Sequence, residues 1–372
     1  MKVIEVSGTP YEMGLSYGFQ CKKDIKKAIS MWYKFGAMSL TPGFREGHPK
    51  LLHMLPKFIT YKKDKSKLQS IAKKYESFII ENCPEIIEEM KGIAEGAKVD
   101  YIDILFLNTF PEVIEGCTIW AACGKAVKTG EPLLAMNTDE MKQTRKIQII
   151  LSAKPDDGYH FIGNTYAGIV SPIHGMNQTG FAYADMLLHV EKPDTPIFGM
   201  SLFPLLKTTI TKSSSVDEAV ELFKKMPRPT CPGAIFYSDS NKITRIENSS
   251  MEYDITLIND DAIACCMIPQ SEKIRKYDST LNLAPTMQIN AIPRQKRMTD
   301  LLKENIELFD IEIMKIIAKD HGKGETKGKS ICQHSAFGTN TIGSFIAKPR
   351  DLKIWMCYGN PCKNRYKEFT LQ

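Results

Sequence analysis

The tripeptide Gly116-Cys117-Thr118 contains a cysteine that could act as a nucleophile. If the peptide bond before Cys117 were cut, that residue would carry both a thiol and a free α-amine. An α-amine with a pKa of about 8 can accept the thiol proton, so one residue would supply the nucleophile and its base. Gly116 has no side chain and allows the strained turn that an N-to-S acyl shift requires. A buried strand cysteine after a turn glycine is the alternative interpretation.

An acidic residue follows Cys117 on what reads as the next strand. The sequence Lys128-Thr-Gly-Glu131 predicts a hairpin turn, so the strand that ends in Asn137 and Asp139 should run antiparallel to the Cys117 strand. Pairing about that turn predicts that Asn137 and Asp139 lie near residues 120 to 122. An acidic group there can hold or orient an α-amine. An ordinary strand-end turn is the alternative role for Asp139.

The residues that precede this step read as helices. Thr9-Pro10-Tyr11-Glu12 is a capping box with proline at the first helical position, which predicts a helix towards Phe35. Gly14 and Gly18 fall on one face of it and indicate close backbone packing. Further helices are predicted from Pro84 to about Gly96 and over 102–110. The predicted division is therefore a helical segment at 1–116 and a body at 117–372.

The body is rich in strands, because the hydrophobic period falls towards two residues after Cys117. The predicted strands cover 117–122, 132–137, 146–153, 159–163, 181–188, 234–239, 242–248, 253–258, 262–268, 341–347 and 352–358. Helices are predicted at 216–226, 294–308 and 311–319. Runs of strands separated by helices predict an α+β fold with packed antiparallel sheets and helices outside.

Composition excludes several classes of protein. The 372 residues are 43% hydrophobic, and a net charge of +6 is spread along the chain among acidic residues, so no nucleic-acid partner is expected. The start lacks the apolar segment of a signal peptide, and no window is apolar enough to span a bilayer, so we expect a cytoplasmic protein without membrane contact. The ten cysteines form no C-x-x-C pair and the histidines no H-E-x-x-H, so no structural zinc site is predicted.

Several motifs in order resemble a known family. They are G-T-P-Y-E-M-G at 8–14, E-M-K-G-I-A-E-G-A at 89–97, G-C-T at 116–118, G-M-N-Q-T-G at 175–180, P-R-Q-K-R-M at 293–298, D-H at 320–321, S-I-C-Q-H at 330–334 and Y-G-N-P-C at 358–362. Together with Asn137-x-Asp139, they resemble the N-terminal-nucleophile (Ntn) hydrolases of the acyl-coenzyme A:isopenicillin N (6-aminopenicillanic acid) acyltransferase family, relatives of the choloylglycine hydrolases.

The resemblance implies a fold and a mechanism. The fold is a four-layer αββα sandwich with a mainly helical leader. The proenzyme cuts itself between Gly116 and Cys117, and the leader of residues 1–116 stays associated with the body of residues 117–372. The Cys117 thiolate attacks an amide or acyl thioester, an acyl-CoA included, and an S-acyl enzyme is resolved by water or an amine. No metal or prosthetic group is implied.

The sequence departs from the family at positions that shape the site. The family's Q-N-W-D is Met136-Asn137-Thr138-Asp139 here. The family's T-N-H, which supplies an oxyanion-stabilising asparagine, is replaced by A-C-C-M-I-P at 264–269. Loss of one such donor costs on the order of a hundredfold in rate. The changes at Met136, Thr138 and nearby Asp185 imply a substrate other than penicillin.

Two further residues are candidates for substrate binding. Asn177 lies in the G-M-N-Q-T-G turn, where turn geometry is the competing role. Arg294 could bind a carboxylate or the phosphates of coenzyme A, with a salt bridge between parts of the chain as the alternative.

Two other functions stay open at this stage. The absent oxyanion asparagine favours an inactive binding or scaffold protein. A papain-like protease would instead pair Cys117 with His174, His321 or His334 and would not cut itself.

Overall fold

The computed structural model describes residues 1–39, 59–109, 117–191, 198–227, 231–282, 285–322, 330–334 and 339–371. Its helices are α1 (Pro10–Ser39), α2 (Ile59–Asn82), α3 (Pro84–Ala97), α4 (Tyr101–Thr109), α5 (Leu202–Lys212), α6 (Val216–Lys225), α7 (Glu272–Arg275), α8 (Pro285–Glu304) and α9 (Ile311–Ala318). Its strands are β1 (Lys2–Gly8), β2 (Thr118–Ala122), β3 (Leu133–Met141), β4 (Gln148–Pro155), β5 (Phe161–Tyr166), β6 (His174–Asn177), β7 (Ala182–Leu187), β8 (Gly233–Ser238), β9 (Ile243–Asn248), β10 (Tyr253–Ile258), β11 (Ala262–Cys265), β12 (Thr339–Lys348), β13 (Lys353–Tyr358) and β14 (Tyr366–Thr370).

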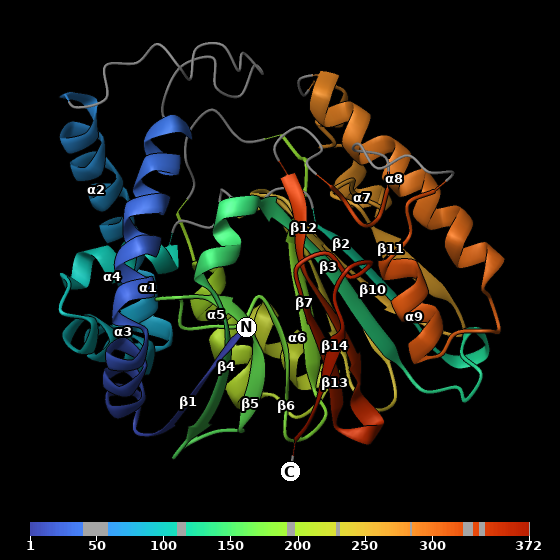
Figure 1. Ribbon diagram of the computed structural model, residues 1–372, viewed down its shortest axis with the longest axis horizontal. Coiled ribbons are helices and arrows are strands. Elements are labelled where there is room, and N and C mark those ends of the chain that lie inside the picture. Colours follow the sequence, from blue (N-terminus) through green and yellow to red (C-terminus); the bar gives the residue numbers. More distant parts are fainter. Residues whose placement is uncertain are drawn as a thin grey trace.

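The strands form two sheets that pack face to face. The eight-stranded sheet has the order β1-β4-β5-β6-β7-β8-β9-β10, and the six-stranded sheet has the order β11-β2-β3-β12-β13-β14. Figure 1 shows helices α1 to α4 on one side of the strands and α8 and α9 on the other. Helices α5 and α6 cover the eight-stranded sheet as well. The predicted α+β class and the αββα layer order are confirmed.

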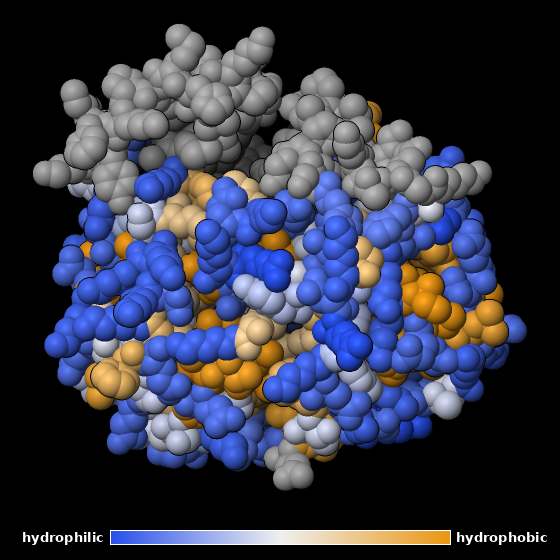
Figure 2. Space-filling view, viewed as in Figure 1, coloured by the Kyte–Doolittle hydropathy of each residue, from blue (hydrophilic) through white to orange (hydrophobic). Residues whose placement is uncertain are grey.

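Two hydrophobic clusters explain the layers. The larger one fills the space between the sheets and continues under the N-terminal helices, while the smaller one joins the outer face of the six-stranded sheet to α8 and α9. The face of the molecule in Figure 2 is mainly hydrophilic, with hydrophobic patches between charged side chains. Within the described residues, no helix combines the length and the apolar character needed to cross a bilayer.

Helix α1 packs closely against α3 at Gly14 and Gly18, as the spacing of these glycines predicts. Thr9 and Glu12 form the predicted capping contacts at the start of α1. A Cβ atom added to Gly14 would lie 2.1 Å from the Glu89 carbonyl oxygen, and one added to Gly18 would lie 2.3 Å from that of Ile93. Helices α1 and α3 therefore touch through their backbones, and only glycine permits this approach.

The predicted N-terminal segment also contributes to the body. Strand β1, which the sequence reading missed, pairs parallel to β4 at the edge of the eight-stranded sheet. In addition, Lys207 of α5 forms a 2.8 Å ion pair with Glu89 of α3, and their side chains are only 5% and 3% exposed. The described part of this segment is mainly helical and is joined to the body by a strand and a buried ion pair.

Three predicted details were wrong. Helix α8 starts at Pro285, not Arg294, because Pro293 is accommodated inside the helix, whereas proline usually marks a helix start or break. Strands β6 and β14 were missed, because neither HGMN nor YKEFT shows alternating apolar and polar residues. The β2–β3 connection is not a simple hairpin turn, because it contains the 3-10 helix Gly124–Ala126.

Candidate active site

Cys117 lies directly before β2, in the interior of the molecule. Strand β2 sits between β11 and β3 within the six-stranded sheet, and Cys117 is 1% exposed in the core between the two sheets. Gly116, the other half of the predicted cleavage step, lies outside the described residues. The thiol is therefore placed at the edge of a rigid strand rather than on a surface loop.

The surroundings of Cys117 keep its thiol protonated in the intact chain. Burial raises the pKa of the thiol, and the nearby Asp139 carboxylate raises it further. A hydrogen bond from the Asp139 backbone amide and the positive charge of Arg294 act in the opposite direction. Burial therefore disfavours the thiolate form of Cys117 in the uncut chain.

The pairing of β2 with β3 brings the predicted residues closer to Cys117 than expected. Asn137 lies opposite Thr118, so the prediction that Asn137 and Asp139 face residues 120 to 122 was wrong. The 3-10 helix in the connection lengthens the loop and shifts the register towards the start of β2. Asp139 thereby reaches the Cys117 end of the strand.

Asp139 is the centre of a fully buried polar network. Its carboxylate pairs with the guanidinium of Arg294 on α8 and accepts hydrogen bonds from Thr341 of β12 and, at 2.8 Å, from the Gln333 amide. Arg294 also donates to Thr118, next to Cys117. Burial raises the pKa of Asp139, whereas Arg294 and the two donors oppose that effect by stabilising the charged form.

Arg294 is therefore a buried residue that pairs with Asp139. Its side chain is 0% exposed, and Asn290 accepts a further 3.1 Å hydrogen bond from it. Of the two roles that the sequence left open, the structure shows the salt bridge. The guanidinium faces Asp139, not a surface on which coenzyme A phosphates would lie.

Alternation along β3 divides the remaining predicted residues between two faces. Asn137 points to the α9 side, where its amide donates to the carbonyls of Ala318 at 2.9 Å and Ile331 at 3.1 Å. Met136 belongs to the core between the sheets, as Cys117 does. Thr138 follows Met136 by two positions and so shares its face.

Thr138 lies beside the thiol. The β2–β3 register, continued by one residue, puts Thr138 opposite Cys117. Its buried hydroxyl has no hydrogen-bond partner among the described residues. The hydroxyl is therefore available to a substrate or to a negatively charged intermediate.

Two predicted binding residues lie elsewhere. Asn177 is buried at the end of β6 and donates to the carbonyls of Ile210 and Ser213 at the end of α5. Asp185 of β7 acts electrostatically on Tyr237, which lies beside Thr209 of α5. The structure thus places both on the helix-covered face of the eight-stranded sheet, away from the face that meets Cys117.

In the structure, the histidines of the papain-like alternative make contacts with other groups. His174 packs against Phe345 between the sheets, and burial lowers its pKa to about 3. His321 and His334 contact each other at 3.2 Å, and His334 contacts two other cysteines. The ionisable side chains that act on the Cys117 sulfur are instead Asp139, Glu140 and Arg294.

Comparison with known proteins places the chain in a family. Residues 127–363 match the family described as acyl-coenzyme A:6-aminopenicillanic acid acyl-transferase, which is well over half of the 372 residues. The chain belongs to this acyltransferase family. The resemblance drawn from the motifs is confirmed. The match includes Asn137, Asp139 and Arg294 but begins after Gly116 and Cys117.

Individual relatives are distant from this member of the acyltransferase family. Protein dcd1A of Dictyostelium discoideum is 24% identical over 281 residues, which cover 70% of this chain and 60% of that protein. The chain thus spans less than two thirds of that relative. The Caenorhabditis elegans ortholog of N-acylethanolamine-hydrolyzing acid amidase has a TM-score of 0.45 at 14% identity, covering 63% of this chain and 93% of its own. A mutant of conjugated bile acid hydrolase from Clostridium perfringens has a TM-score of 0.41 at 14% identity, covering 69% and 97%.

The structure locates the substitution of the oxyanion asparagine expected from the acyltransferase family. Strand β11 pairs with β2, and Cys265 lies opposite Ile119. The next residue, Cys266, interacts with the Thr118 side chain and lies within the electrostatic influence of Arg294, so a thiol occupies a position beside the start of β2. The backbone continues through Met267 with a left-handed φ of 66°. The pairing of β11 with β2 therefore brings the substituted segment next to Cys117.

Sequence reasoning missed three residues near the thiol. Glu140 and Tyr166 interact electrostatically with Cys117, and Trp32 of α1 packs edge-on against Tyr166 at 5.7 Å. Gln333 was missed as a partner of Asp139, although it stands in the S-I-C-Q-H motif. Residue types alone do not reveal such partners, because they come from segments far apart in the sequence.

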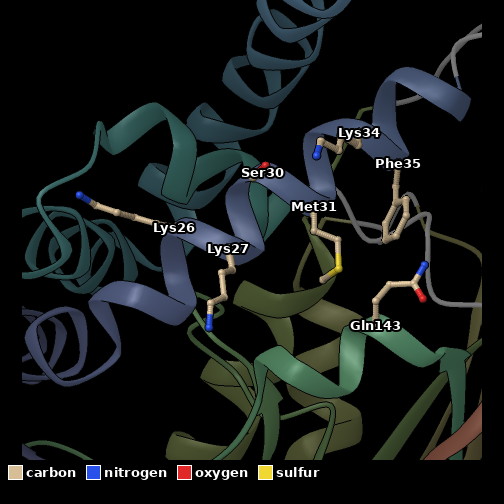
Figure 3. A pocket seen from close by; sticks show the side chains of 7 residues that line it. All are labelled: Lys26, Lys27, Ser30, Met31, Lys34, Phe35 and Gln143. Atoms are coloured by element: carbon tan, nitrogen blue, oxygen red, sulfur yellow. The ribbon is translucent and has the colours of Figure 1, made fainter. Parts of the chain in front are cut away.

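An open pocket lies over this aromatic side of the site. It has a volume of about 540 Å³ and is lined by Lys26, Lys27, Ser30, Met31, Lys34, Phe35 and Gln143. Figure 3 shows Met31 and Phe35 extending from α1 towards Gln143. Phe35 packs on Trp32 at 5.6 Å, and Trp32 packs on Tyr166. A row of aromatic contacts therefore connects the pocket wall to the surroundings of Cys117.

Proposed function

We propose that the protein is an Ntn cysteine amidohydrolase or acyltransferase that cuts itself between Gly116 and Cys117. The observation that carries the proposal is the position of Cys117, directly before a buried strand and beside the Asp139–Arg294 pair. Membership of an acyltransferase family supports acyl transfer as the reaction class.

In this mechanism, self-cleavage supplies the base that deprotonates the Cys117 thiol. Before the cut, burial keeps the Cys117 thiol protonated. The cut frees an α-amine whose ordinary pKa is about 8, and this amine takes the thiol proton. Asp139 holds the resulting ammonium, while Arg294 fixes the orientation of the carboxylate. The site is therefore active only after processing.

Turnover then follows in two steps. The thiolate attacks the carbonyl carbon of an amide or acyl thioester, the C–N or C–S bond breaks, and the leaving amine or thiol takes a proton from the ammonium. The acyl group rests on sulfur until water or an amine attacks the thioester carbonyl carbon. The C–S bond then breaks, and the Cys117 amine accepts the proton that the attacking group loses and returns it to the sulfur. The Thr138 hydroxyl is our candidate donor to the charged intermediate, in place of the asparagine that the family uses elsewhere.

The cleaved leader, residues 1–116, stays bound to the body in this proposal. Strand β1 is part of the eight-stranded sheet, and the Glu89–Lys207 pair is buried between α3 and α5. Dissociation of the leader would break the pairing of β1 with β4 and would separate the Glu89–Lys207 ion pair. The leader fragment is thus a permanent subunit.

Acyl-enzyme formation tests the proposed activity. Purified protein is mixed with a panel of acyl thioesters and N-acyl amino acids, and the chain masses are measured under denaturing conditions. We expect an acyl adduct on the fragment that begins at Cys117, and none in Cys117→Ala. Cys123→Ala is the matched control, because Cys123 is buried in the same core cluster. An adduct or turnover that persists in Cys117→Ala would refute the assignment, and binding without turnover would favour the scaffold function.

A further inference from the structure

Four metal-binding side chains meet near the C-terminal end of the chain. They are His321, Cys332, His334 and Cys362, and their ligand atoms all lie within 4.8 Å of one another. His321 follows α9, Cys332 and His334 lie in the segment before β12, and Cys362 lies in the turn after β13. Cys332 is buried and the other three are half-buried. None of them contributes to the Cys117 network described above.

Four of the six distances between these ligand atoms are close to the edges of a tetrahedron, and the other two, from His321 to the two sulfurs, are at most 4.8 Å. The two sulfur atoms are 3.6 Å apart, and the two Nε2 atoms are 3.2 Å apart. Nε2 of His334 lies 3.6 Å from the sulfur of Cys332 and 3.2 Å from that of Cys362. With Zn–S of about 2.3 Å and Zn–N of about 2.0 Å, a tetrahedral site has S–S edges of about 3.8 Å and N–N and N–S edges of about 3.3 to 3.5 Å. The sulfurs are also far beyond the bond length of a disulfide, about 2.05 Å.

Hydrogen bonding does not account for the convergence. Nε2 of His334 has three polar neighbours, namely His321, Cys332 and Cys362. An imidazole nitrogen carries either one proton or one lone pair, so it cannot satisfy all three. A cation at the common centre satisfies every one of these atoms at once.

We propose that His321, Cys332, His334 and Cys362 bind one Zn²⁺ ion in a closed tetrahedral site. Two thiolates and two neutral imidazoles balance the charge of the ion, which suits a largely buried position. A tetrahedral set of two sulfurs and two nitrogens favours zinc over harder divalent cations. Because all four positions are taken by protein side chains, the site is structural.

The ion would join three segments next to the Asp139 network. Gln333, between ligands Cys332 and His334, donates to Asp139 through its side chain, and its backbone amide donates to the Thr341 hydroxyl at 2.8 Å. Asn360, two residues before Cys362, donates to the Gln333 carbonyl at 2.6 Å. Bound zinc would therefore hold the short segment 332–334 in place, and with it the Gln333 side chain that donates to Asp139.

This site differs from the expectation that the chain has no structural zinc. That expectation rested on local spacing, and the cluster has only a Cys332-x-His334 step within one segment. His321 and Cys362 come from separate segments that the fold brings together. A search for ligands at short sequence spacing cannot detect a site whose ligands come from separate segments.

Metal analysis of the full chain tests the proposal. Protein expressed with zinc and desalted should contain about one zinc per chain. Cys362→Ser and His334→Ala should each lower zinc at least about tenfold. Cys357→Ser is the matched control, because Cys357 is a buried thiol on the adjoining strand and should leave the zinc content unchanged. Cobalt substitution should give the thiolate charge-transfer and intense d–d absorption of a tetrahedral site.

Thermal unfolding of the wild type tests the zinc site even if a ligand variant does not fold. A strong zinc chelator should lower the Tm of the wild type, and added zinc should restore it. Wild-type protein without bound zinc, or with a Cys332–Cys362 disulfide in its place, would overturn the proposal. Zinc retained by both folded ligand variants would do the same. These readouts are independent of self-cleavage and acyl transfer, so the zinc site and the proposed function succeed or fail separately.

Discussion

Arg294 of α8 and Asp139 of β3 form an ion pair in which neither side chain has any exposure to solvent. The pair connects the outer helical layer to the strand beside Cys117. Because Arg294 also donates to Thr118, the pair fixes the start of β2 as well as Asp139. The geometry of the candidate site therefore depends on the attachment of α8 to the six-stranded sheet.

Removing one partner of this pair should destabilise the protein strongly. In a Cys117→Ala background, Arg294→Met should lower the free energy of unfolding by about 3 to 5 kcal/mol, because it leaves a buried carboxylate unpaired. Urea unfolding measures the change. Lys128→Ala is the control, because the side chains of its ion pair with Asp310 are 50% and 38% exposed, and its loss should cost less than about 1 kcal/mol. Equal costs for the two variants would contradict the account of the pair.

Close packing of α1 on α3 gives a second prediction. Gly14→Ala should destabilise the protein by several kcal/mol, of the order seen for overpacked cores, because a Cβ atom would lie 2.1 Å from the Glu89 carbonyl oxygen. Thermal unfolding of the variant should show a lower Tm. Lys23→Ala changes an exposed residue of the same helix and should leave the Tm nearly unchanged. An unchanged Tm for Gly14→Ala would mean that the two helices can separate at little cost.

Asp185 should make stability depend on pH. Burial raises its pKa to about 8 in the folded state, against about 3.9 when unfolded. The folded state therefore holds the proton more tightly, so its contribution to stability is full below about pH 4 and declines as the pH rises to 8. The decline is at most about 1.4 kcal/mol per pH unit.

Asp185→Asn removes that dependence. The Tm of the variant minus that of the wild type should rise steadily between pH 5 and pH 8. Asp157→Asn is the control, because a hydrogen bond from Lys212 lowers the pKa of Asp157, so no rise is expected. A constant difference between Asp185→Asn and the wild type would show that Asp185 is ionised in the folded protein.

The sequence was sufficient for the α+β class and for placing Asn137 and Asp139 on the strand beside that of Cys117, but not for the register of the two strands. Capping boxes and alternation are local signals, so they located α1, α3, α6 and most of the strands. They could not locate the partners of Asp139, because Arg294, Thr341 and Gln333 approach it from three other segments. The 3-10 helix after β2 moved Asn137 from the expected pairing near residues 120 to 122 to a pairing with Thr118, a change that turn residues do not reveal.

Thr138 should contribute directly to acyl transfer. Thr138→Val removes the buried hydroxyl that faces the Cys117 side and should slow acyl-enzyme formation by about a hundredfold. Thr138→Ser keeps the hydroxyl and should retain most of the rate. Rapid mixing with an acyl thioester, followed by mass measurement, gives both rates. A Val variant as fast as the Ser variant would exclude the hydroxyl as a donor.

The central claim is that Cys117 becomes an N-terminal nucleophile through self-cleavage. Denaturing intact mass spectra of the purified wild type and of Cys117→Ala test it most directly. We expect the wild type to yield two fragments that meet between Gly116 and Cys117, and Cys117→Ala to remain one chain. A wild type that stays uncut while it turns over substrate, or a Cys117→Ala variant cut at the same bond, would contradict the claim.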